Sequence, residues 1–164
     1  MQQCAAAGYR IRAVIMPILP VPDRADGHGE IDGYVKLLDD LLTTVPVERI
    51  TLGSLCSFPN ALRLTDAKLG DDNPIRQLLR NGNPSADNHS AERCGGHSTA
   101  RSGNQSADGR FRFHASTRTA CYRMLIDVIR SHRPDLPIGL CLEEKSTFAE
   151  LALSANIGIC NCVL

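Results

Sequence analysis

Apolar residues recur along the chain with two spacings, one typical of buried strands and one typical of amphipathic helices. Residues 10–19, RIRAVIMPIL, are mostly apolar and rich in β-branched side chains, which predicts a buried strand of the parallel kind, covered on both faces. Residues 48–53 and 136–142 predict two further strands. Over residues 31–44 and 117–132, apolar side chains fall three and four positions apart. That spacing predicts two amphipathic helices, each of which ends before a proline.

Shorter elements are expected between and after these. A helix over residues 58–69 begins near a proline and is closed by Gly70. Thr147 and Glu150 have the spacing of a capping box and predict the start of a short helix. The last residues, IGICNCVL at 157–164, are apolar and predict a final strand.

One stretch differs from the rest of the chain. Residues 81–109 are dominated by Gly, Ser, Asn and Asp, and repeat a short pattern as NPSAD, NHSAE and NQSAD. Such a composition buries too little apolar surface to offset the entropy of ordering. We therefore expect a disordered insertion there, which divides the chain into residues 1–80, the insertion, and residues 110–164.

Outside the insertion, predicted strands and helices alternate. This order predicts an α/β fold with a parallel sheet and crossover helices. The number of elements corresponds to about half of a (β/α) barrel. A partial barrel leaves two sheet edges open, which is unfavourable for a free-standing protein.

Composition narrows the possible functions only slightly. Among the 164 residues, 43% are hydrophobic, and 18 Lys and Arg balance 18 Asp and Glu. A chain without net charge lacks the electrostatic footprint of a nucleic-acid-binding or membrane-surface protein. No apolar run reaches the roughly 18 residues that span a bilayer, and the N-terminus does not have the pattern of a signal peptide. These features predict a cytoplasmic protein.

The cysteines do not predict a disulfide framework. There are seven, an odd number at wide spacings. Cys160 and Cys162 form a C-x-C pair that fits packing on one face of a strand or, alternatively, a metal or redox role. His89, Cys94 and His97 have suitable side chains for a transition metal, but they fall in the predicted insertion, where ordering them is costly. We expect chance occurrence for these three.

Three polar residues follow the predicted strands. Ser54 directly follows the strand at 48–53, Arg63 lies shortly beyond it, and Glu143 follows the strand at 136–142. Ligands of parallel α/β folds bind at the carboxyl ends of the strands. The three residues are therefore candidates for ligand or cofactor binding. For Glu143 a second interpretation is equally good, a carboxylate favoured by the dipole of the helix it precedes.

Three long segments carry a family resemblance. They are AGYRIRAVIMPILPVPD, VERITLGSLCSFPNALRL and GRFRFHASTRTACYRMLIDVIRSHRPDLPIGLCLEE, the last completed by ICNCVL. In this order they resemble the C-terminal half of radical S-adenosylmethionine (radical SAM) proteins of the spore photoproduct lyase family. The resemblance covers everything except the insertion, and the order and spacing of the segments carry it.

This resemblance implies about half of a radical SAM TIM-like barrel. The family holds a [4Fe–4S] cluster and S-adenosylmethionine, whose reductive cleavage yields a 5′-deoxyadenosyl radical. In the lyase, this radical reverses a thymine dimer in spore DNA.

The sequence departs from the family at the cluster site. The family binds its cluster through C-x-x-x-C-x-x-C near the start of the barrel, and no three cysteines of this chain have that spacing. We therefore expect no cofactor in this chain alone. Three hypotheses remain open: an inactive C-terminal fragment, half of an enzyme whose N-terminal barrel half is separately encoded, or an independent small metal-binding or scaffold protein.

Overall fold

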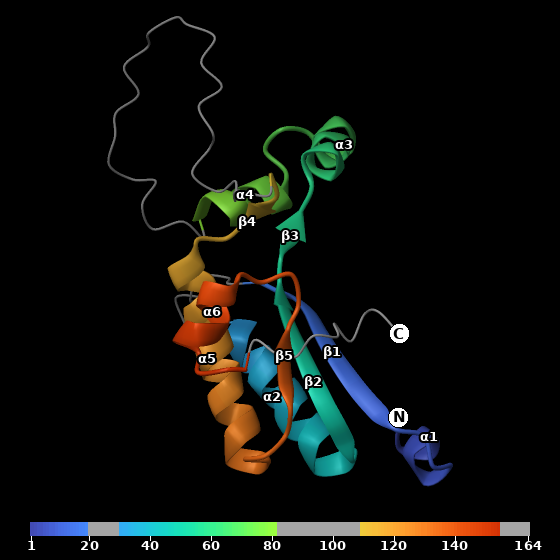
Figure 1. Ribbon diagram of the computed structural model, residues 1–164. Helices are drawn as coiled ribbons and strands as arrows, with labels where there is room; N and C mark the ends of the chain where they lie inside the picture. The colour runs from blue at the N-terminus through green and yellow to red at the C-terminus, as the bar shows by residue number, and fades with distance from the viewer. Residues whose placement is uncertain (20–29, 82–108, 155–164) are drawn as a thin grey trace, which may run out of the picture. The chain divides into compact units, whose positions relative to one another are not determined.

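The computed structural model describes residues 1–19, 30–81 and 109–154. Within them, strands and helices alternate much as the sequence predicts (Figure 1). Apart from its two end residues, the predicted disordered insertion lies outside the described residues, as does the predicted final strand at 157–164. No helix in the described ranges combines the length and the apolarity that crossing a membrane would require.

The described residues fall into two compact units. The first takes its residues from 1–55 and 115–164, and the second from 56–114. The first unit contains α1 (Gln2–Ala6), β1 (Ile11–Ile18), α2 (Glu30–Thr44), β2 (Val47–Ser54), α5 (Ala115–His132), β5 (Ile138–Leu140) and α6 (Lys145–Glu150). The second contains β3 (Cys56–Ser57), α3 (Pro59–Leu69), α4 (Pro74–Asn81) and β4 (Phe111–Arg112).

A parallel three-stranded sheet organises the first unit. Its strand order is β1-β2-β5, so each strand neighbours the next one of this sheet along the chain. Ile15 of β1 lies beside Leu52 of β2, which in turn lies beside Leu140 of β5. This arrangement confirms the predicted parallel α/β sheet. The described strands form an open sheet and do not close into a barrel.

Helices α2 and α5 connect the strands and pack together against one face of the sheet (Figure 1). Their buried side chains meet alternate residues of the strands in one aliphatic core. Leu38 of α2, Leu125 of α5 and Ile50 of β2 are each fully buried there. The period of three and four residues on the helices and of two on the strands thus builds a single core.

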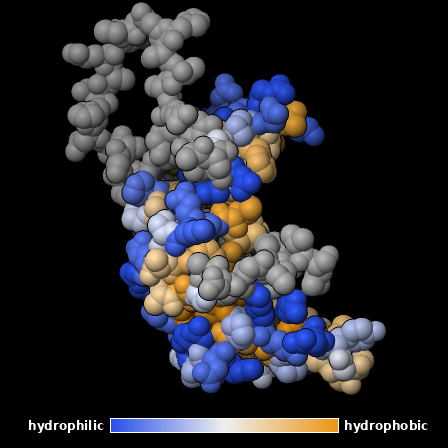
Figure 2. Space-filling model, viewed as in Figure 1, coloured by the Kyte–Doolittle hydropathy of each residue, from blue (hydrophilic) through white to orange (hydrophobic). Residues whose placement is uncertain are grey.

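The opposite face of β1 differs from the prediction. Along this strand Ile11, Ala13 and Ile15 are buried, whereas Val14 and Met16 are 49% and 40% exposed. The predicted cover on both faces is therefore wrong for β1, which lies at one edge of the sheet. On the side of the molecule that Figure 2 shows, some apolar surface lies among hydrophilic side chains. The prediction failed because an apolar run does not distinguish a two-sided strand from an edge strand with exposed apolar residues.

The predicted capping box is also wrong. Helix α6 begins at Lys145 with Glu144 as its N-cap residue, and no side-chain hydrogen bond caps it. Thr147 instead lies inside the helix and is buried. The preceding strand β5 is shorter than residues 136–142, and beyond its end the chain turns at Leu142 with φ of 57°.

In the second unit, α3 matches its predicted bounds closely. Pro59 is its first residue, where the missing amide hydrogen is harmless, and Gly70 ends it with φ of 87°. Helix α4 was not predicted. The two strands of this unit pair in antiparallel fashion, with Cys56 beside Arg112.

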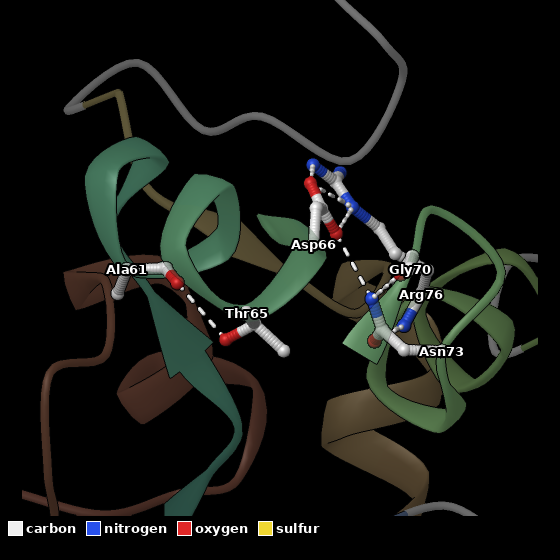
Figure 3. Close-up of polar contacts among 6 residues, drawn as sticks. All are labelled: Ala61, Thr65, Asp66, Gly70, Asn73 and Arg76. Atoms are coloured by element: carbon white, nitrogen blue, oxygen red, sulfur yellow. Dashed lines mark hydrogen bonds and ion pairs between the residues drawn. The ribbon is translucent and has the colours of Figure 1, made fainter. Parts of the chain in front are cut away.

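A buried amide links α3 to α4 (Figure 3). Asn73 accepts a hydrogen bond from the backbone N–H of Arg76 (3.1 Å), which caps α4, and its Nδ2 donates to Asp66 of α3 (2.9 Å). Arg76 also pairs with Asp66, with 2.6 Å between Nη2 and Oδ2. This hydrogen bond is the main reason why the pKa of Arg76 is raised. These contacts are those of a helix-helix connection and point to no ligand.

Candidate functional site

Two of the three candidate residues lie together in the first unit. Ser54 is the last residue of β2, and Glu143 follows the end of the neighbouring strand β5. The hydroxyl of Ser54 donates a hydrogen bond to Oε1 of Glu143 over 3.2 Å. The backbone N–H of Cys141 still bonds to the carbonyl of Leu52 (2.8 Å). The turn at Leu142 therefore places Glu143 directly beyond the paired strands.

Tyr122 of α5 joins these two residues. Its hydroxyl donates to Oε1 of Glu143 and accepts a hydrogen bond from the backbone N–H of Ser54, both over 2.7 Å. The side chain is completely buried. Burial and, after it, the charge of Glu143 raise the pKa of Tyr122. The hydroxyl therefore stays protonated and keeps both hydrogen bonds at neutral pH.

Arg118, one turn before Tyr122 on α5, completes the arrangement. Its Nε lies 3.1 Å from each carboxylate oxygen of Glu143. The side chains of Arg118 and Glu143 are only 5% and 2% exposed, so this ion pair is shielded from water. We call Ser54, Arg118, Tyr122 and Glu143 the Glu143 cluster. It ties the ends of two strands to one helix.

The energetic weight of the Glu143 cluster follows from its burial. A buried ion pair contributes little compared with an apolar packing of the same shape, but removing one partner leaves an uncompensated charge. The backbone N–H of Ser54 likewise depends on one partner, because its hydrogen bond goes to the hydroxyl of Tyr122. The cluster is therefore an interdependent unit in which each member satisfies another.

The third candidate, Arg63, belongs to the other unit. It lies on α3 and is exposed to solvent. It is not part of the Glu143 cluster, whose four members all belong to the first unit. The prediction made no distinction among the polar residues that follow strands. Arg63 lies on α3, in the unit that begins at Cys56.

Sequence reasoning missed Arg118 and Tyr122. Both lie on the predicted helix at 117–132, four residues apart, and spacing of that kind puts two side chains on one helix face. Tyr122 falls next to the apolar stripe of this helix, which was the available signal. An arginine on the buried side of a helix has no such signal, because its burial depends on the carboxylate that meets it.

The Glu143 cluster lines neither of two hollows in the surface of the first unit. One, of about 490 Å³, lies between α1 and α2, and the other, of about 370 Å³, lies near the start of β5. Because the members of the cluster are buried and bonded to one another, their arrangement can hold strand ends in place. A reacting group would need an open face toward a substrate.

The described cysteines do not supply a cluster site. Cys4 is exposed, Cys56 and Cys121 are half-buried, and Cys141 is buried. Burial raises the pKa of the Cys121 thiol, which makes it a poor thiolate ligand. Within the described ranges no three His, Cys, Asp or Glu side chains are grouped for a metal ion. Cys94, Cys160 and Cys162, like His89 and His97, lie outside the described residues.

No protein-family model, no curated protein and no solved structure matches this chain.

Proposed function

We propose that the chain is a partial (β/α) barrel, the C-terminal half of a protein of the radical SAM, spore photoproduct lyase type, and that it is inactive alone. The order and spacing of three sequence segments support this proposal. The parallel β1-β2-β5 sheet with α2 and α5 as crossovers is compatible with it. In the complete barrel, other strands would continue the sheet beyond its open edges.

The observation that carries the proposal is the position of the Glu143 cluster. Ser54 and Glu143 meet at the carboxyl ends of adjacent parallel strands, where barrels of this kind bind their ligands. Arg118 and Tyr122 of α5 both donate hydrogen bonds to the carboxylate of Glu143 and so fix its orientation. We assign these side chains a positioning role, in which they set the shape of the barrel mouth.

The residues present do not fit a [4Fe–4S] cluster. A cluster needs cysteine thiolates from one preorganised loop, and the sequence has no C-x-x-x-C-x-x-C. We therefore propose that the cluster, and with it the radical chemistry, is supplied by a separate N-terminal barrel half. The present chain contributes strands and part of the barrel mouth. We assign no chemical step to its own residues.

Association with such a half tests the proposal. The purified chain is mixed with the N-terminal half of a spore photoproduct lyase and analysed by size exclusion with light scattering. We expect a one-to-one complex. The N-terminal half of an unrelated (β/α) barrel serves as the control and should leave the chain unbound. Binding to neither half, or to both equally, would contradict the proposal.

A further inference from the structure

The hollow of about 490 Å³ between α1 and α2 has an apolar floor. Leu37, Leu41 and Val45 line it at intervals of four residues along α2 and just beyond its end. Side chains with this spacing lie in one row, here about 12 Å long. Val45 belongs to the aliphatic core of the first unit and Leu41 packs against it, whereas Leu37 is 50% exposed. The floor therefore extends from the core out to solvent.

Helix α1 forms the facing wall of this hollow, and two contacts hold it in place. Ala5 packs against the aliphatic core, and Nε2 of Gln2 donates a hydrogen bond to the backbone carbonyl of Thr44 over 3.3 Å. Met1, directly before α1, is exposed and lines the hollow, as the exposed Leu37 does. Single exposed apolar residues are ordinary, but exposed apolar residues that gather at one hollow favour a binding site.

One carboxylate belongs to the same helix face. Asp40 lines the hollow, three residues after Leu37 and four before Thr44, which also line it. Its carboxylate forms no ion pair or hydrogen bond with the described part of the chain. The hydroxyl of Thr44 donates to the backbone carbonyl of Asp40. The adjacent Asp39, by contrast, pairs with His132 of α5. The hollow thus combines an apolar floor with one negative charge that the described residues do not neutralise.

We propose that the hollow between α1 and α2 binds a small amphiphilic amine, a molecule with a protonated amino group and an apolar chain. The ammonium group pairs with the carboxylate of Asp40, and the chain lies along the row from Leu37 to Val45. The volume of the hollow falls within the range of roughly 300–1,000 Å³ that is usual for small-molecule sites. All its residues belong to the first unit, so the proposal goes beyond the proposed barrel and does not depend on it.

Amide NMR of the ¹⁵N-labelled full chain tests the site, with n-hexylamine hydrochloride as the probe at neutral pH and constant ionic strength. We expect the backbone amide signals of Leu41 and Thr44 to shift and saturate. The neutral n-hexanol should bind about threefold to fivefold more weakly, as the loss of an exposed ion pair predicts. Sodium hexanoate should bind more weakly still, because its charge repels Asp40. Equal binding of the three compounds, or the absence of a saturable shift at these amides, would overturn the proposal.

A pair of charge variants assigns the binding to Asp40. Asp40→Asn changes an exposed side chain, so the fold is retained. This variant should bind hexylamine about threefold to fivefold more weakly than the parent and hexanol equally well. Asp39→Asn removes the same charge one residue away, beside His132, and should bind hexylamine as the parent does. Parent-like binding of hexylamine by Asp40→Asn, or an equal loss in Asp39→Asn, would overturn the assignment.

A pair of apolar variants tests the floor. Leu37→Ala should weaken the binding of both hexylamine and hexanol by about fivefold, because part of the apolar contact area is lost. Met124→Ala on α5 removes a similarly exposed apolar side chain away from the hollow and should leave both affinities unchanged. Equal affinities of the two variants for hexylamine would show that the apolar chain does not lie along this row, and would overturn the proposal.

Discussion

At the scale of single residues, the Glu143 cluster shows which part of a site a sequence reveals. Ser54 and Glu143 were each predicted as candidates because each follows a strand of a parallel sheet, and the structure joins them by a hydrogen bond. Arg118 and Tyr122 were not predicted, because a polar residue on a helix is expected at the surface until its partner is known. The contact between α5 and the turn at Leu142 is a tertiary contact, and the local spacing of apolar residues does not predict it.

Removing the charge of Glu143 should destabilise the fold strongly. Glu143→Gln removes the carboxylate charge that pairs with the buried guanidinium of Arg118, and we expect a loss of about 3 kcal/mol in the free energy of unfolding. Glu150→Gln is the matched control, since the Glu150 pair with Arg123 is long and exposed at 3.9 Å. Urea denaturation measures both. Equal effects of the two substitutions would refute the importance of the buried pair.

The hydroxyl of Tyr122 should matter more than that of Tyr34. Tyr122→Phe leaves the buried amide of Ser54 without an acceptor, at an expected cost of about 1–3 kcal/mol. Tyr34→Phe removes a solvent-exposed hydrogen bond to the carbonyl of Pro17 and a longer one, of 3.3 Å, from the partly buried N–H of Leu19. Because both bonds are more open to water than those of Tyr122, this substitution should cost less. The urea denaturation midpoints of the parent and of the two variants are compared. A larger loss for Tyr34→Phe would show that the cluster is not the stabilising site.

Tyr122 also predicts a dependence on pH. Its pKa is raised in the folded state above the ordinary value of 10.0, so folding favours the protonated phenol. The stabilisation is therefore complete below pH 10 and is lost as the pH rises beyond it. The stability difference between the parent and Tyr122→Phe should shrink from about pH 10 upward. A difference that stays constant through this range would show that the phenol does not titrate with folding.

At the scale of elements, predictions succeeded where backbone chemistry fixes an end. Helix α3 was placed correctly because Pro59 suits a first turn and Gly70 suits a helix end. Helix α4 was missed because it has only eight residues and lacks a long apolar stripe. The capping box at Thr147 failed because spacing alone does not show which residue begins a helix. Strand β1 was located, but its exposed face depends on the sheet edge.

Two glycines should respond to the same substitution with opposite signs. Gly70→Ala forces an alanine to adopt φ of 87° and ψ of 164°, which should destabilise the protein by about 1–3 kcal/mol. Gly33→Ala lies inside α2 with no atom nearby and should stabilise the protein by about 0.5–1 kcal/mol. Helical signal followed in urea measures both. Destabilisation by Gly33→Ala would contradict the described environment of α2.

At the scale of the whole molecule, the alternation of elements predicted the parallel sheet, and the sheet is there. The partial barrel is a finer statement that rests on the resemblance of three segments and stays a proposal. The division into two units was not foreseen, because α3, α4 and the short pair β3 and β4 come between elements of the first unit in sequence. Contacts distant in sequence decide this grouping, and local patterns do not report them.

The formation of 5′-deoxyadenosine shows whether this chain completes a radical SAM barrel. The chain is incubated without oxygen with S-adenosylmethionine, a reductant and the iron-loaded N-terminal half of a spore photoproduct lyase, and the product is quantified. We expect no product from the chain alone, and more product from the mixture than from the N-terminal half alone. Product from the chain alone, or a mixture no better than the N-terminal half, would contradict the claim that this chain is the missing half of a radical SAM barrel.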